Sequence, residues 1–165
     1  DACIFIDLIE LDLVALFFKL DVQLHTTVDV VNELLPEQKQ LLKEFETEKL
    51  LTIHNLGERD INEMAKIPFS NGLSHQDKSV LYIAKILKNG IVISSDGLVR
   101  KFAERQKLEC HGLLWVIDQL VIHGICSNFS ASSLLKRLMS LNKMYATGKL
   151  KREIEERILK WSSLS

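Results

Sequence analysis

Short strand-like segments alternate with helix-like segments along this chain, and this alternation constrains the fold more than any other feature. Runs of β-branched and apolar residues occupy 22–26, 50–54, 91–94 and 108–111. Between them, apolar residues recur at helical spacing, most clearly over 74–89. Strands joined by helices of this length form right-handed crossovers and a parallel sheet covered on both faces. The sequence therefore predicts an α/β fold.

The remaining helix-like segments set the expected domain organisation. They lie at residues 28–35, 37–49, 58–66, 98–107, 113–122, 132–142 and 150–161. No composition break separates the chain, and 165 residues is the length of one domain with a sizeable core. We therefore expect one domain, with an α/β core over 1–125 and a helical C-terminal extension over 126–165 packed on that core.

Composition excludes several classes of protein. Apolar residues make up 47% and charged residues 26% of the chain, and the longest apolar runs are far shorter than the roughly 18 residues of a membrane span. The three cysteines are an odd number at unrelated spacings, so neither a disulfide framework nor a zinc site is expected. No signal peptide is visible, and we expect a cytoplasmic protein without membrane contact. We also expect that a few natural residues precede Asp1, because the opening strand-like run begins abruptly.

Four acidic residues fall where a parallel sheet gathers ligands, at the carboxyl ends of strands. Asp96 follows the strand over 91–94, and Glu33 lies two helical turns past the strand that ends near Thr26. Asp1 adjoins the opening apolar segment, and Asp77 lies in the first turn of the helix over 74–89. These acids are the candidate site.

Each acid also has a structural interpretation. Ser74 and Asp77 have nearly the spacing of a capping box, and Asp96 stands where an N-cap precedes an apolar helix. Glu33 could be an exposed helix residue and Asp1 a surface acid. Position alone leaves both interpretations open.

Four motifs in series favour the functional interpretation, because the chain resembles the PIN domain of VapC-like toxins over roughly residues 1–125. Each matching segment contains one of the four candidate acids together with apolar residues of a strand or helix. They are Asp1-Ala2-Cys3-Ile4-Phe5-Ile6-Asp7-Leu8, Thr26-Thr27-x-x-Val30-x-x-Glu33, Leu73-Ser74-His75-Gln76-Asp77-x-x-x-Leu81-x-x-Ala84 and Ile93-Ser94-Ser95-Asp96-x-x-Val99-Arg100-x-x-Ala103. Cys3 stands where the family more often has Ser, and Ser94 where it more often has Thr. The long C-terminal helices resemble a prokaryotic subset with a helical tail.

The resemblance implies a three-layer α/β/α fold with a five-stranded parallel sheet, and a metal-dependent ribonuclease. Carboxylates pressed together repel unless a cation joins them, and oxygen ligands suit Mg²⁺ or Mn²⁺. We expect Asp1 and Asp96 to hold the principal metal, with Asp77 completing that site directly or through water. Glu33 would bind a second metal or orient the attacking water, and Ser94 would donate a hydrogen bond to an acid.

The resemblance also implies partners. Arg100 and Lys101, one turn past Asp96, are candidate contacts to the RNA backbone. The protein would be the toxin of a toxin–antitoxin pair, blocked by a small antitoxin, and would form a dimer. One alternative is a PIN-like domain that binds RNA or protein without catalysis. A phospho-acceptor receiver domain also gathers acids at strand ends, but the sequence has no central acceptor Asp.

Overall fold

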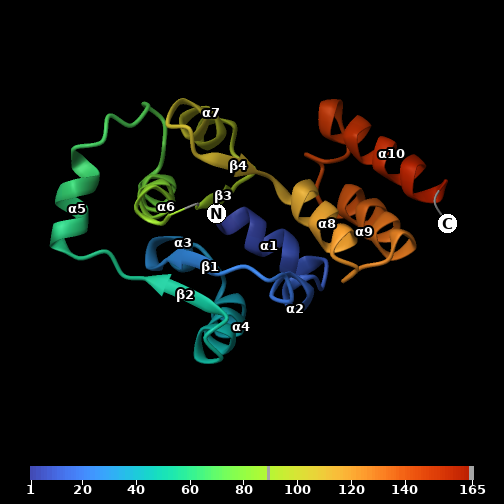
Figure 1. Ribbon diagram of the computed structural model, residues 1–165, viewed down its shortest axis with the longest axis horizontal. Helices are drawn as coiled ribbons and strands as arrows, with labels where there is room; N and C mark the ends of the chain where they lie inside the picture. The colour runs from blue at the N-terminus through green and yellow to red at the C-terminus, as the bar shows by residue number, and fades with distance from the viewer. Residues whose placement is uncertain (89, 164–165) are drawn as a thin grey trace. The chain divides into compact units, whose positions relative to one another are not determined.

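The computed structural model describes residues 1–88 and 90–163, and contacts divide them into two compact units (Figure 1). The strand-bearing unit comprises residues 1–6 and 22–113. The helical unit comprises residues 7–21 and 114–163 of the described chain. Helix α1 (Ala2–Glu10) contributes residues to each unit.

The strand-bearing unit holds two parallel strand pairs. β1 (Leu24–Thr27) pairs with β2 (Leu51–His54), in the register that sets Leu24 opposite Leu51 and Thr27 opposite His54. β3 (Ile91–Ile93) pairs with β4 (Glu109–His111), with Ile91 opposite Glu109. Parallel pairs require crossover connections, and helices lie between the paired strands along the chain. The predicted α/β class is confirmed.

Helices connect and cover these pairs. They are α3 (Val28–Asn32), α4 (Pro36–Thr47), α5 (Glu58–Ala65), α6 (His75–Ile86) and α7 (Gly97–Arg105). α6 contacts both β1 and β3, so one helix packs on both strand pairs, while α4 packs on β2 and α7 on β4. The helix predicted over 74–89 ends earlier than expected because Leu87 adopts an extended backbone, and Asn89 lies outside the described residues.

The expectation of a five-stranded sheet is wrong for the described residues, which form two separate two-stranded sheets. One cause lies in the opening segment, which was expected to be strand-like and instead begins α1. The Asp1 carboxylate accepts a hydrogen bond from the backbone nitrogen of Ile4 at 2.9 Å, as a helix cap does. Ile4, Phe5 and Leu8 are all buried, which is a helical spacing. The three-layer arrangement stays a prediction.

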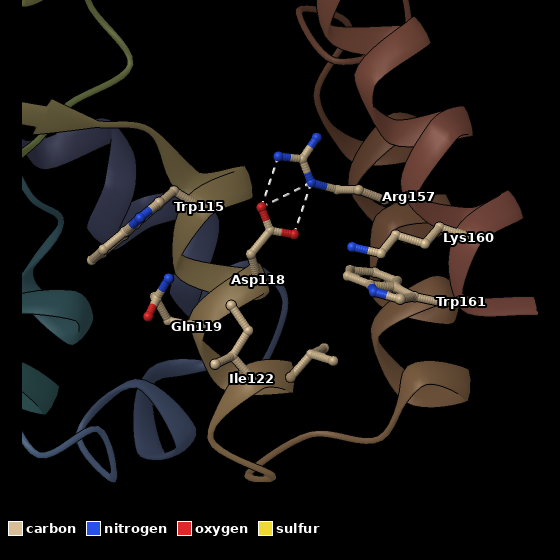
Figure 2. Close-up of a pocket in the computed structure, with 8 residues that line it drawn as sticks. Trp115, Asp118, Gln119, Ile122, Arg157, Lys160 and Trp161 are labelled. Atoms are coloured by element: carbon tan, nitrogen blue, oxygen red, sulfur yellow. Dashed lines mark hydrogen bonds and ion pairs between the residues drawn. The ribbon is translucent and has the colours of Figure 1, made fainter. Parts of the chain in front are cut away.

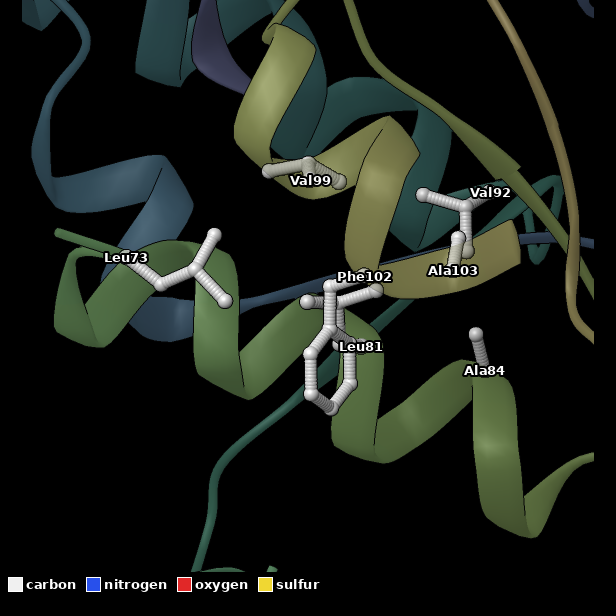
Figure 3. Close-up of a cluster of buried hydrophobic side chains, with 7 residues drawn as sticks. All are labelled: Leu73, Leu81, Ala84, Val92, Val99, Phe102 and Ala103. Carbon is white, nitrogen blue, oxygen red and sulfur yellow. The ribbon is translucent and has the colours of Figure 1, made fainter. Parts of the chain in front are cut away.

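The core of the strand-bearing unit lies between α6, α7 and β3 (Figure 3). Its buried side chains are Leu73, Leu81, Ala84, Val92, Val99, Phe102 and Ala103. The central strand residue Val92 is 1% exposed, whereas its neighbour Ile91 is 41% exposed. Burial of this kind stabilises a fold by about 25 cal/mol for each Å² of apolar surface. The packing holds α6, whose first turn contains Asp77, and α7, which Asp96 precedes as its N-cap.

The helical unit contains α2 (Val14–Phe17), most of α8 (Leu113–Ile122), α9 (Asn128–Leu141) and α10 (Gly148–Ser162). α9 packs against α10, and the bounds of α8 agree with the segment predicted over 113–122. The short helix α2 was not predicted. Contacts group α8 from Leu114 with the later helices. The functional division at residue 125 remains a prediction.

Polar contacts connect the helices of this unit. Figure 2 shows the guanidinium of Arg157 on α10 directed at the carboxylate of Asp118 on α8, and both of its oxygens accept hydrogen bonds. A pocket of about 370 Å³ beside this ion pair is lined by residues that include Trp115 and Trp161. None of the helices that the described residues form is long and apolar enough to span a bilayer.

The end of α1 is held by the segment that follows α9. Asp7 is buried, and Asn142 donates a hydrogen bond from Nδ2 to its Oδ1 at 3.1 Å. Burial raises the pKa of Asp7, while hydrogen bonds from Asn142 and Tyr145 partly oppose that rise. Arg137 binds the carboxylate of Asp12 and the carbonyl of Glu10.

Candidate active site

The candidate site is built around the residue that follows β3, Ser94. Its backbone nitrogen donates to the carbonyl of His111 at 2.8 Å, which extends the pairing of β3 with β4 by one step. Its hydroxyl donates to Asp1 Oδ2 and accepts a hydrogen bond from the backbone nitrogen of Asp96 at 3.1 Å. Ser94 is fully buried. One hydroxyl group therefore forms hydrogen bonds with both Asp1 and Asp96, the two residues predicted to be the principal metal ligands.

Asp1 is held at the carboxyl end of β3. Its α-amino nitrogen donates to the carbonyl of Ile93 at 3.0 Å, and Ser95 donates its backbone nitrogen to Oδ2 at 3.0 Å. With the bonds from Ser94 and Ile4, both carboxylate oxygens have donors. Each carboxylate oxygen keeps further acceptor capacity, since an ionised carboxylate offers about four lone-pair directions. Asp1 is thus fixed in place while it can still bind a cation.

Asp96 caps α7. Its Oδ1 accepts hydrogen bonds from the backbone nitrogens of Leu98 at 2.5 Å and Val99 at 3.2 Å. The structural interpretation of this residue is therefore correct, and it does not exclude the functional one. Asp96 is exposed, and its Oδ2 accepts no hydrogen bond from the described residues. The cap orients one oxygen and leaves the other for a ligand.

Asp77 forms a complete capping box with Ser74. Its Oδ2 accepts from the backbone nitrogen of Ser74 at 3.0 Å and from the Ser74 hydroxyl at 2.7 Å. In return, Ser74 Oγ accepts from the backbone nitrogen of Asp77 at 3.0 Å. Within the described part of the chain, Asp77 Oδ1 accepts no hydrogen bond. As at Asp96, one oxygen holds the helix start and the other remains open.

Glu33 follows α3 directly and is exposed. Its helix begins at Thr27, whose hydroxyl accepts from the backbone nitrogen of Val30 at 3.3 Å. The position of Glu33 is therefore set by a helix of little more than one turn that starts at the carboxyl end of β1.

The negative charges of Glu33 and Asp77 act electrostatically on Asp1. Burial lowers the pKa of the amino group of Asp1 to about 6, and the negative charges of Asp77 and Glu33 partly oppose this lowering. Asp77 and Glu33 therefore contribute to one electrostatic environment with the acid that Ser94 holds. The structure joins Asp1 to Asp96 by hydrogen bonds and relates Asp77 and Glu33 to Asp1 through charge.

The donor set suits a hard divalent cation in its chemistry, since all four predicted ligands are carboxylates. Whether these carboxylates come close enough together to bind one ion is a separate question. Among residues 1–88 and 90–163, no three His, Cys, Asp or Glu side chains come close enough to hold a metal ion. The structure thus shows anchored acids with open oxygens rather than a closed coordination sphere.

Arg100 lies on α7, and its guanidinium is close to Gly112, the residue that follows β4. A Cβ atom added to Gly112 would lie 3.3 Å from Arg100 Nη2 and 3.7 Å from the carbonyl oxygen of Ser94. Gly112 thus leaves room for the guanidinium next to the segment that holds Asp1 and Asp96. Burial raises the pKa of the Cys110 thiol, and the charge of Arg100 partly opposes this. Lys101 is exposed, and no described contact directs it to the acids.

The sequence did not predict a histidine pair between β1 and β2. His25 Nδ1 and His54 Nε2 are 2.9 Å apart, and the rings stack with centroids separated by 5.2 Å. Burial lowers the pKa of both imidazoles. Only the strand register brings them together, because Thr27 is opposite His54 and His25 lies two residues earlier on the same face.

A family model described as a PIN domain matches residues 1–159 of the chain. The match extends over both units and includes all four predicted acids. It confirms the resemblance to PIN domains drawn from the four motifs, without distinguishing a toxin subtype. The chain matches no individual curated protein.

Proposed function

The chain belongs to the PIN-domain family, whose members are generally nucleases, and we propose that it is a divalent-metal-dependent endoribonuclease that hydrolyses RNA phosphodiester bonds. The observation that carries this proposal is the Ser94 hydroxyl, which binds the Asp1 carboxylate and the backbone of Asp96. A buried hydroxyl that orients two acids at a strand end is the kind of support that metal ligands need.

PIN domains generally bind Mg²⁺ or Mn²⁺, and in our proposal Asp1 and Asp96 hold the principal ion. Asp77 completes that site directly or through water, and Glu33 binds a second ion or orients the attacking water. When bound, such an ion activates water and neutralises charge on the phosphate. The open Oδ1 of Asp77 and Oδ2 of Asp96 are the atoms available for this role.

The protein's own groups prepare the site. Because the Ser94 proton is directed at Asp1 Oδ2, this bond favours the ionised form of that carboxylate. The cap bonds of Asp96 and the capping box of Asp77 hold each carboxylate in one orientation before any substrate arrives. These contacts reduce the reorganisation that binding would otherwise require.

Arg100 and Lys101 are the proposed contacts to the RNA backbone. The guanidinium of Arg100 and the carbonyl oxygen of Ser94 both lie next to Gly112, and the planar fork of the guanidinium suits the oxygens of a phosphate. Lys101 is the weaker candidate, since only its exposure and its place beside Arg100 support it. Removal of either side chain would weaken binding to RNA of any sequence.

The likeness of the four motifs to VapC-like toxins supports a narrower proposal: a toxin that is inhibited by a small antitoxin and that forms a homodimer. Exposed apolar side chains provide surface for such contacts. On the helical unit, Ile122, Phe129 and Leu159 are 70%, 79% and 73% exposed.

The proposal is tested by cleavage of single-stranded and structured RNA with Mn²⁺, using Asp96→Asn and Asp77→Asn. Asn is nearly as good an N-cap as Asp at position 96, and at position 77 an amide oxygen can still accept the Ser74 bonds of the capping box. Both variants should therefore remain folded while they lose a carboxylate. We expect each to reduce cleavage by about 10- to 100-fold or more. The control Glu37→Gln removes an exposed acid from α4 and should cleave normally. RNA binding without cleavage by the unmodified protein would establish the alternative, a non-catalytic PIN-like module.

A further inference from the structure

Two fully buried hydroxyl groups connect α3, which directly precedes the proposed acid Glu33, with α6, which carries the proposed acid Asp77. Thr27 is the last residue of β1 and the N-cap of α3, and Ser79 lies in the first half of α6. Their hydroxyl oxygens are 2.8 Å apart, and both residues are 0% exposed. Polar side chains buried so completely need hydrogen-bond partners within the protein.

The neighbours determine the direction of the hydrogen bond between them. Ser79 Oγ lies 2.7 Å from the carbonyl oxygen of Gln76, which can only accept, so the Ser79 proton is directed there. The Thr27 proton is then directed at Ser79 Oγ. Thr27 Oγ1 in turn accepts from the backbone nitrogen of Val30 at 3.3 Å. The bonds form one directed chain from Val30 through Thr27 and Ser79 to Gln76.

Each end of this series of hydrogen bonds is close to a proposed acid. Val30 lies in α3, which ends at Asn32 directly before Glu33, and the backbone nitrogen of Glu33 donates to the carbonyl of Val30 at 3.1 Å. Gln76 directly precedes Asp77. The series of hydrogen bonds therefore connects the backbone next to Glu33 with the backbone next to Asp77.

A second contact joins the same two helices at the surface. His75 Nε2 lies 3.5 Å from Asp29 Oδ2, and the two side chains are 53% and 33% exposed. Exposed ion pairs contribute little because solvent screens them and ordering two side chains costs entropy. The buried hydroxyl pair is different, since removal of one partner leaves the other without its bond.

We propose that Thr27 and Ser79 are positioning residues of the nuclease: their hydroxyl pair sets the placement of Glu33 relative to Asp77. This inference rests on the proposed function, because it assigns the two acids to one site. Neither hydroxyl touches the substrate. The pair acts by fixing α3 against the start of α6, where small displacements change how the two carboxylates meet a cation.

The test compares Thr27→Val with Thr26→Val, which makes the same substitution at the adjacent buried threonine. We expect Thr27→Val and Ser79→Ala to lower kcat about 10- to 100-fold and to weaken Mn²⁺ binding, measured by calorimetry with the metal alone. The KM for RNA should change little. Thr26→Val and Asp29→Asn should retain normal kcat, and Thr27→Ser, which keeps the hydroxyl, should restore most of it.

A further comparison separates positioning from general stability. Thr27→Val is introduced into Glu33→Gln, and kcat is measured well below the unfolding temperature. If Thr27 acts through Glu33, the added substitution causes no further loss. A full additional loss, or a normal kcat for Thr27→Val, overturns the inference while leaving the nuclease proposal intact. If the unmodified protein neither binds Mn²⁺ nor cleaves RNA, the proposed function fails and the inference falls with it.

Discussion

The hydroxyl of Ser94 donates a hydrogen bond to the carboxylate of Asp1, a residue 93 positions away in the sequence. The contact brings the start of α1 to the end of β3, and the same hydroxyl accepts the backbone nitrogen of Asp96. Ser94 is buried, so no solvent molecule readily replaces it. The candidate site therefore depends on one small polar side chain as much as on its acids.

Replacing Ser94 tests this dependence. We expect Ser94→Ala to reduce Mn²⁺-dependent cleavage about 10- to 100-fold, because Asp1 loses a donor and the Asp96 nitrogen loses an acceptor. Ser94→Thr keeps the hydroxyl and should retain most of the activity. The rates are measured with saturating metal. Equal rates for the Ala and Thr variants would show that the hydroxyl is not what matters.

Asp7 should make stability depend on pH. Its pKa is raised by burial, so the folded state binds a proton more tightly than the unfolded state. The stability that this group contributes is fully present below its unfolded pKa of 3.8 and is lost as pH rises through the raised folded pKa. Asp7→Asn remains neutral and should gain in Tm relative to the unmodified protein between pH 4 and 7. A constant Tm difference across that range would contradict the assignment.

The His25–His54 pair should make stability depend on pH in the opposite direction from Asp7. Burial lowers both pKa values below 6.5, so the unfolded state takes up protons first as pH falls. The contribution is present above pH 6.5 and is lost as pH falls through the lowered folded pKa values. Thermal melts from pH 7.5 to 5 should therefore show a smaller loss of Tm for His25→Gln than for the unmodified protein. His123→Gln, at an exposed position on the helical unit, serves as the control.

The ion pair between Arg157 and Asp118 should stabilise the helical unit. The two side chains are only 23% and 26% exposed, and three hydrogen bonds join them. Arg157→Met should lower the free energy of unfolding by about 1.5–3 kcal/mol in denaturant titrations, because Asp118 is left without its partner. Lys149→Met removes an exposed partner of Glu153, where the Lys149 side chain is 83% exposed, and should cost less than about 0.5 kcal/mol.

Periodicity predicted the helices and strands because each depends on local spacing. The segment over 113–122 and the strand over 91–94 appear almost as expected. The opening residues were assigned incorrectly, since Asp1–Ile6 reads equally as a short apolar strand or as the first turns of a buried helix. Only the cap bond to Ile4 and the buried positions of Ile4, Phe5 and Leu8 distinguish the two.

The acids of the candidate site were selected from their positions and from the four motifs, and their role in a metal site stays a prediction. Of the strand ends used for that selection, the one before Asp96 is present, whereas the segment that begins at Asp1 is helical. The Thr27–Ser79 and His25–His54 contacts depend on which strands and helices become neighbours. Nothing in the spacing of a single sequence specifies that register.

The most direct test of the account is an anomalous diffraction map from crystals of this chain grown with Mn²⁺. The account predicts a peak coordinated by the carboxylates of Asp1 and Asp96, with Asp77 within reach directly or through water, and loss of that peak in Asp96→Asn. A map with no Mn²⁺ peak among these acids, or with a peak that persists in Asp96→Asn, would contradict the proposed metal site.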